Sequence, residues 1–221
     1  FRAAVVATLS STGSRRHTGA VNWSGALAAD IDELRRMAVE ERPDAMGEII
    51  SEADEFITKF LHLLSATPAT HPATTRMLIV ADALTAIIAM HYKFHFNRAR
   101  PTQVLPGLLS PIQHTGHASY PSGHATQANA FAALLTAIIP ASLGNADPTP
   151  TNQQNTTVGT ALTVLAKRIA RNREIAGLHY PSDTTAGEIL SKAIVEKILL
   201  DPSYLPKFKG LVDAARAEWG P

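Results

Sequence analysis

Apolar side chains recur at three- and four-residue steps over most of the chain, a pattern typical of helices that bury one face. The first series runs from Leu27 to Ala38, and Pro43 is expected to end that helix, with Asp44 capping the next. We expect the second helix to continue without a break to Leu64. Because alternating strand patterns and repeats are nearly absent, the sequence predicts an all-α, single-domain helical bundle.

Further helices are expected over residues 75–98, 122–139, 157–177, 182–200 and 204–219. They are separated by a proline-containing connector, a long irregular segment and a polar surface loop, over residues 67–75, 101–121 and 140–155. A long structureless segment inside a compact domain is usually functional. We assign residues 1–23, rich in Ser, Thr and Arg, to an N-terminal arm and residues 24–221 to the helical domain.

Composition narrows the functional classes. Of the 221 residues 45% are hydrophobic and 18% charged, with a net charge of +1, so nothing in the balance indicates nucleic acid or an anionic membrane as a partner. The absence of cysteine excludes disulfides and thiolate metal sites. The longest apolar run, Met77 to Met90, contains Asp82, and we expect no transmembrane segment. The chain starts at Phe1, and a periplasmic or secreted location is the working expectation, although no signal segment is visible.

Three short motifs could carry chemistry. In the first, KFHFNRARP, Lys93 and Arg100 are seven residues apart, and seven steps of about 100° return to nearly the same side of a helix. Two cations on one face could clamp a compact anion. The alternative is a basic helix end that complements its own dipole.

The second motif is PSGH, at the predicted start of the helix over residues 122–139. A helix start has unpaired N–H groups and a positive dipole end, which together favour an anion. Gly123 lets the anion approach the backbone, Ser122 can donate its hydroxyl, and His124 can transfer a proton. The alternative is an ordinary Ser cap with an incidental histidine.

The third motif is NREIAGLHYPSD. Arg173 lies near a helix end that Gly177 is expected to terminate, and His179 and Asp183 follow on the turn. Asp183 could fix one imidazole nitrogen and leave the other free as a nucleophile or ligand. The alternative is a turn in which Asp183 only caps the next helix.

Taken in order, the motifs read Lys-x6-Arg-Pro, Pro-Ser-Gly-His and Arg-x5-His-x3-Asp. This series resembles the superfamily that joins type 2 phosphatidic acid phosphatases, bacterial class A acid phosphatases and vanadium-dependent haloperoxidases. The resemblance covers residues 93–183. The chain departs from the usual pattern at Asn172, where a Ser often precedes the third-motif Arg, but an amide can still form local hydrogen bonds.

The resemblance implies a role for each motif residue. Phosphate would be bound by Lys93, Arg100, Arg173, Ser122 and the Gly123 amide. His179 would attack phosphorus and form a phosphohistidine, oriented by Asp183, while His124 protonates the leaving group and then activates water. On this interpretation the protein is a phosphomonoester hydrolase of the acid phosphatase type that needs no metal or other cofactor.

The same pocket supports a rival function. In the haloperoxidases of this superfamily vanadate takes the phosphate position, so vanadate would bind at His179. His117, seven residues before His124, adds weight because bromoperoxidases carry a His at that spacing; otherwise it is a histidine of the pocket rim. The short segments between the motifs favour the phosphatase, and an inactive helical scaffold ranks last. The expected partner is a small phosphorylated substrate, either a water-soluble ester or a lipid reached from the surface; homo-oligomerisation is left open.

Overall fold

A computed structural model describes residues 24–113, 115–140 and 158–220, together with Val5 and two short strands, β1 (Ser14–Arg15) and β2 (Val21–Asn22). The helices are α2 (Ser24–Glu40), α3 (Arg42–Ser51), α4 (Ile57–Leu63), α5 (Pro72–Phe96), α6 (Pro101–Val104), α7 (Gly123–Ile138), α8 (Val158–Ile175), α9 (Pro181–Ile194) and α10 (Pro206–Ala217), with a 3-10 turn η1 (Pro106–Leu108) and a π-helical turn η3 (Val195–Leu199). The antiparallel pair β1–β2 is the only strand pairing within the described residues, so the all-α prediction is confirmed. The polar loop expected over residues 140–155 lies, apart from Pro140, outside the described residues.

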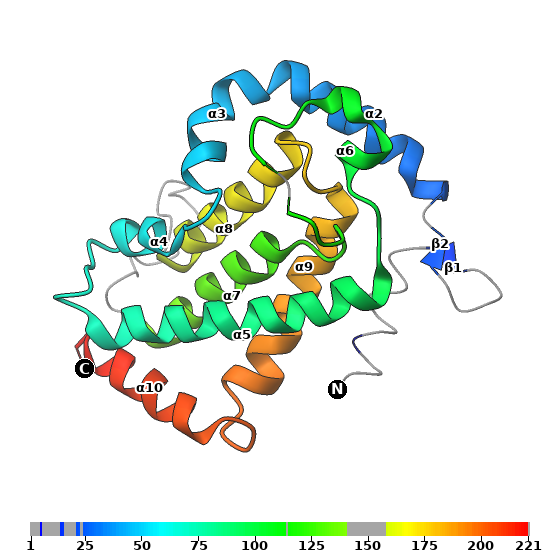
Figure 1. The fold of residues 1–221 in the computed structure, drawn as a ribbon. Coiled ribbons are helices and arrows are strands. Elements are labelled where there is room, and N and C mark those ends of the chain that lie inside the picture. Colours follow the sequence, from blue (N-terminus) through cyan, green and yellow to red (C-terminus); the bar gives the residue numbers. More distant parts are fainter. Residues whose placement is uncertain are drawn as a thin grey trace, which may run out of the picture.

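Helix α7 is the centre of the bundle and packs against α5, α8 and α9, while α10 crosses α5 on the outside (Figure 1). The apolar residues of α7 are buried on almost all sides of the helix, as expected of a core helix. The main core includes Phe60, Met77, Leu78, Phe131, Leu134, Leu162, Ile169, Leu190 and Ile194. A smaller cluster fastens α2 and α3 to the turn after α8 and includes Leu34, Met37, Ile49, Leu108, Ile175 and Tyr180.

The expectation of one continuous helix up to Leu64 is wrong. Helix α3 ends at Ser51 and α4 begins at Ile57, with Phe56 as its N-cap residue. The Glu55 carboxylate, one residue earlier, accepts the backbone N–H of Thr58 at 3.0 Å in the first turn of α4. Apolar periodicity continues through the break, so it could not reveal the break. The interruption leaves the last carbonyls of α3 available to side chains from other helices.

The helix boundary near Pro43 also differs from the prediction. Helix α2 already ends at Glu40, and α3 begins at Arg42, so Pro43 and Asp44 both stand in the first turn of α3. The first turn tolerates proline because its N–H groups have no intrahelical partner. Proline therefore opens the second helix here and does not terminate the first.

Helix α5 begins at Pro72, inside the segment expected to be a connector, and ends at Phe96. Its N-terminus is capped from the end of the chain, since the Glu218 carboxylate accepts the N–H groups of Ala73 and Thr74 at 2.6 and 2.9 Å. By length and composition the segment Pro72–Val104 could cross a membrane. An 18-residue window within it has a mean hydropathy of 1.6, and 33% of that window is buried inside the protein. The expected absence of a transmembrane segment therefore remains a prediction.

The segment between α5 and α7 is less irregular than expected. It contains the short helix α6 and the turn η1, while residues 97–100, Leu105 and the described part of 109–122 lack helical structure. The predicted start of α7 at Ser122 is confirmed, with Ser122 as its N-cap. Gly177 also stands just past the end of α8 as predicted, with a φ of +76° that favours glycine.

Candidate active site

A cavity of about 600 Å³ opens where α3, α5, α7 and the turn before α9 meet. Of the nine residues singled out in the sequence, seven line it, namely Lys93, Arg100, His117, Gly123, His124, Arg173 and His179. The other two, Ser122 and Asp183, are fully buried behind the lining. Its apolar wall is formed by Ile50, Ala53, Ala86, Ala89, Met90, Ile112 and Leu178.

Lys93 and Arg100 do not share a helix face. Helix α5 ends at Phe96, Asn97 adopts a left-handed conformation with a φ of 44°, and Arg100 lies beyond it as the N-cap of α6. The geometric premise from the sequence was therefore wrong, although both side chains reach the cavity. The chain reversal after α5 brings them together.

Lys93 is buried, and its Nζ donates to the carbonyls of Ala118 and Ser119 at 3.0 and 2.9 Å. These two bonds hold the loop before α7 against the end of α5. Burial and, next, the nearby Arg100 lower the pKa of Lys93 to about 7. An ammonium has three hydrogens, so one donor remains for a ligand in the cavity.

Arg100 uses most of its donors inside the protein. Nε donates to the carbonyl of His117 at 2.9 Å, Nη1 to that of Leu178 at 3.0 Å, and Nη2 to the Thr115 hydroxyl at 2.9 Å. The ring Nδ1 of His117 lies 3.1 Å from Nη2. Arg100 therefore supplies positive charge while tying two loops together, and His117 sits on the cavity wall as the partner of this arginine.

The N-terminus of α7 is held open toward the cavity at Gly123. A Cβ built there would meet only the ends of Gln127 and Lys93, at 3.7 and 3.9 Å. The Ser122 hydroxyl instead accepts the N–H of Ala125 at 3.3 Å, so Ser122 caps the helix. Behind this turn, a Cβ on Gly187 would lie 2.8 Å from the Ser122 carbonyl, so α9 can approach closely only because residue 187 is glycine.

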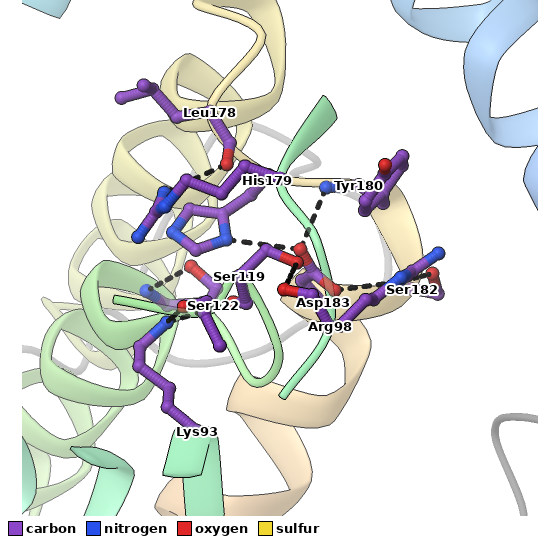
Figure 2. Close-up of polar contacts among 12 residues, drawn as sticks. Lys93, Arg98, Ser119, Ser122, Leu178, His179, Tyr180, Ser182 and Asp183 are labelled. Carbon is purple, nitrogen blue, oxygen red and sulfur yellow. Dashed lines mark hydrogen bonds and ion pairs between the residues drawn. The ribbon is translucent and has the colours of Figure 1, made fainter. Parts of the chain in front are cut away.

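His179 and Asp183 form the expected pair. His179 Nδ1 lies 3.2 Å from Asp183 Oδ2, and the same oxygen accepts the N–H of Tyr180 at 3.0 Å (Figure 2). Asp183 thus contacts His179 and also caps the start of α9. Since a carboxylate only accepts, Nδ1 carries the proton and Nε2 keeps its lone pair. Burial lowers the pKa of His179 well below its ordinary value, which keeps the ring neutral.

Arg98 completes this side of the site and was missed at the sequence level. Its Nη1 donates to Asp183 Oδ1 and to the Ser182 hydroxyl, both at 2.7 Å, and Nη2 pairs with Asp30 at 3.1 Å (Figure 2). Its guanidinium also stacks on the Tyr180 ring at 3.8 Å. Burial alone would raise the pKa of Asp183, but the His179 hydrogen bond and Arg98 hold it below the ordinary value. The sequence signal that could have indicated Arg98 is its position in the first motif, two residues before Arg100.

His124 is held by a backbone carbonyl. Its Nε2 lies 3.0 Å from the carbonyl of Glu52, and its ring packs on Phe56 with centroids 5.1 Å apart. A carbonyl only accepts, so Nε2 carries the proton in the neutral ring and Nδ1 is the acceptor. Burial and, next, Arg173 lower the pKa of His124 to about 4. The ring is therefore neutral near pH 7 until a bound anion offsets the charge of Arg173.

Arg173 offers the strongest sign of an anion site. Its side chain is 1% exposed, and Nη2 donates to the Ile49 carbonyl at 2.8 Å, but Nε and Nη1 are buried without a hydrogen-bond partner. Leaving a buried donor unpaired costs about 1–3 kcal/mol, and more for a charged group. Because Arg173 lines the cavity, a tetrahedral oxyanion there would satisfy both nitrogens.

Together the helices bring Lys93, Arg100 and Arg173, the neutral rings of His124 and His179, and the open N-terminus of α7 to one cavity. This arrangement has the chemistry needed to hold a tetrahedral oxyanion. The family model described as "PAP2 superfamily" matches residues 74–201, more than half of the chain. The chain therefore belongs to the PAP2 superfamily.

Two known proteins are similar to this chain, one over less than half of its length and the other over most of it. The first is a "Vanadium-dependent bromoperoxidase" from Ascophyllum nodosum, 34% identical over an alignment of 111 residues that covers 44% of this chain and 20% of that protein. The chain thus spans about a fifth of the matched relative. The second is the crystal structure of a transmembrane PAP2 type phosphatidylglycerolphosphate phosphatase from Bacillus subtilis, 16% identical over 89% of this chain and 87% of the other. Its TM-score of 0.37 is too low to carry an argument.

Proposed function

We propose that the protein is a phosphomonoester hydrolase that works through a phosphohistidine at His179. The observation that carries the proposal is the placement of a neutral imidazole, with Nε2 unprotonated, in the same cavity as the unpartnered donors of Arg173. Phosphoryl transfer is largely a matter of positioning and charge stabilisation, and both are supplied by these side chains.

The first step would form a bond between His179 Nε2 and phosphorus while the bond from phosphorus to the ester oxygen breaks. Lys93, Arg173 and the Gly123 amide would bind the phosphoryl oxygens, and Arg100 would add positive charge beside them. His124 would protonate the leaving oxygen once the anion has raised the pKa of its ring. In the second step a water molecule would attack phosphorus, giving a proton to His124 and releasing phosphate from His179.

This mechanism needs no metal, because the charge that develops on the phosphoryl group is met by protein cations and a helix N-terminus. Within the described ranges, no group of three or more His, Asp or Glu side chains could hold a metal ion. Substrates would be small phosphate esters whose organic part lies against the apolar wall at Ile50, Ala86 and Met90. The proposed class remains acid phosphatase-like.

A vanadate-dependent bromoperoxidase is the second candidate, favoured by the similarity to the bromoperoxidase and by His117 on the cavity wall. The residues fit vanadate, since His179 Nε2 could ligate it and Arg173 has unpartnered donors for its oxygens. When bound, vanadate would supply the activation of peroxide for halide oxidation. His124 would then hold or move a proton at Nδ1.

Parallel assays would separate the two candidates. We expect the protein to hydrolyse p-nitrophenyl phosphate, to be inhibited competitively by vanadate and to keep its activity in EDTA. Bromination of a dye would be followed in the same preparation with added vanadate and hydrogen peroxide. Bromination without ester hydrolysis would contradict the phosphatase proposal, and activity lost to EDTA and restored by a divalent ion would contradict the metal-free mechanism.

A further inference from the structure

Glu52 is a buried carboxylate that lies next to the cavity but outside the segment matched by the family model. It is the C-cap residue of α3, is 1% exposed, and comes from the helix break that the sequence did not reveal. Its Oε2 accepts from Asn172 Nδ2 at 2.9 Å and lies 3.6 Å from Arg173 Nη2, while Oε1 lies 3.6 Å from Lys59. A buried carboxylate is stable only with such partners.

The end of α3 holds one nitrogen of Arg173 and leaves the others free. Nη2 donates to the Ile49 carbonyl at 2.8 Å and faces Glu52, while Nε and Nη1 have no partner. Because the guanidinium is planar, fixing Nη2 also fixes the plane in which Nε and Nη1 present their hydrogens. The contacts from α3 therefore determine how Arg173 meets a ligand.

The same residue holds the second group through its backbone. The Glu52 carbonyl lies 3.0 Å from His124 Nε2, so side chain and main chain of one residue contact Arg173 and His124. Carbonyls at a helix C-terminus carry partial negative charge, which suits both a guanidinium and an imidazole that becomes protonated. A movement of Glu52 would displace the phosphate-binding arginine and the proton-transfer histidine together.

Asn172 anchors this arrangement. Its Nδ2 donates to Glu52 at 2.9 Å and to Glu48, one turn earlier on α3, at 3.0 Å. An amide nitrogen has two hydrogens to donate, whereas the single hydroxyl hydrogen of a serine could serve only one carboxylate. The residue that departs from the usual third motif is thus the one that bonds two turns of α3.

We propose that Glu52, anchored by Asn172, is a positioning residue that sets the orientation of Arg173 and His124 for phosphoryl transfer. The inference rests on the proposed function, because it assigns these two groups to the transferred phosphoryl group. It predicts that neutralising Glu52 weakens the binding of a transition-state mimic, which is the opposite of the change expected from charge alone. Neutralising a carboxylate beside an anion site would by itself tighten anion binding, whereas loss of positioning weakens binding of a transition-state mimic more than binding of a ground-state anion.

The test compares vanadate and inorganic phosphate binding by calorimetry in the wild type and in Glu52→Gln. We expect vanadate affinity to fall about 10- to 100-fold and phosphate affinity to fall less than about threefold, because orientation matters most in the transition state. Turnover should show the same division, with kcat reduced and KM little changed. The matched control is Glu48→Gln, which removes the charge of the other carboxylate bound by Asn172, a carboxylate that does not contact Arg173.

Glu52→Gln binding vanadate as tightly as the wild type, or more tightly, would overturn the proposal, as would an equal loss in Glu48→Gln. If Glu52→Gln does not fold, Asn172→Ser provides the second variant and should shift vanadate affinity in the same direction by a smaller factor. The phosphatase proposal and the positioning role of Glu52 can fail separately. A wild type that binds both anions but hydrolyses no ester contradicts the phosphatase proposal, while the binding data still decide the role of Glu52.

Discussion

Of the three histidines that line the cavity, the two with proposed catalytic roles are held in different ways. His179 is tied at Nδ1 to Asp183, a carboxylate that Arg98 and the Tyr180 N–H hold in place. His124 is tied at Nε2 to the backbone carbonyl of Glu52, which adds no full charge. Both bonds fix a tautomer, but only Asp183 places a full negative charge beside its histidine, where it stabilises positive charge on the His179 ring.

This difference separates the proposed roles. A nucleophile that becomes a phosphoimidazolium benefits from an ionised partner, whereas a proton-transfer group needs a fixed tautomer and one free ring nitrogen, and the Glu52 carbonyl leaves Nδ1 of His124 free for that role. The pKa directions agree with this division, since the pKa of Asp183 is held below its ordinary value and that of His124 is lowered to about 4.

Replacing the proposed nucleophile should have the largest effect. In His179→Ala we expect turnover to fall on the order of 10⁴-fold or more for every ester, because the proposed covalent intermediate forms at His179 Nε2. The measurement is kcat with aryl and alkyl phosphates, together with intact mass after a rapid quench that avoids acid. A phosphoryl adduct in this variant would assign the nucleophile to another residue.

Replacing the other histidine should give a result that depends on the leaving group. In His124→Ala we expect alkyl phosphate hydrolysis to fall on the order of 10²- to 10⁴-fold, while cleavage of p-nitrophenyl phosphate is reduced far less, because p-nitrophenolate departs without an acid. Release of phosphate from the enzyme also needs His124, so a burst and a one-phosphoryl adduct should accumulate. Equal losses for all leaving groups without an adduct would refute this role.

The two arginines of the cavity should respond unequally to a lysine. Arg173→Lys should cost on the order of 2–4 kcal/mol of transition-state stabilisation, because an ammonium cannot replace the unpartnered donors at Nε and Nη1. Arg100→Lys should cost less, since the donors of Arg100 already serve Thr115, His117 and Leu178. Comparing kcat/KM of the two variants measures the difference, and a larger loss at Arg100 would show that its fork reaches the substrate.

The smallest effect concerns pH. With a pKa of about 7, Lys93 loses its charge as pH rises through that value, so anion affinity should fall above pH 7 and be fully present below it. Sulfate is a suitable probe because it stays a dianion throughout. We expect its affinity to drop about tenfold or more between pH 6 and pH 8.5. In Lys93→Arg the guanidinium stays charged, and a curve as steep as that of the wild type would assign the titration to another group.

The helices outside the broken stretch could be predicted from the sequence because their signals are local. Apolar periodicity, the Ser122 cap and Gly177 act within one or two turns, and each stands where it was expected. The break between α3 and α4 was missed because periodicity passes through it. The early end of α5 was missed because it depends on a left-handed Asn97 and on the reversal that follows.

The sequence predicted which side chains gather, since the three ordered motifs supply six of the seven predicted residues that line one cavity. It could not determine how their donors are shared, because that depends on backbone carbonyls and loops far away in the chain. Arg100 was expected to clamp the anion, yet its donors bind Thr115, His117 and Leu178, while the free donors belong to Arg173. Only the tertiary structure brings Glu52 to Arg173 and His124, because contacts between residues 72 and 121 positions apart leave no local pattern.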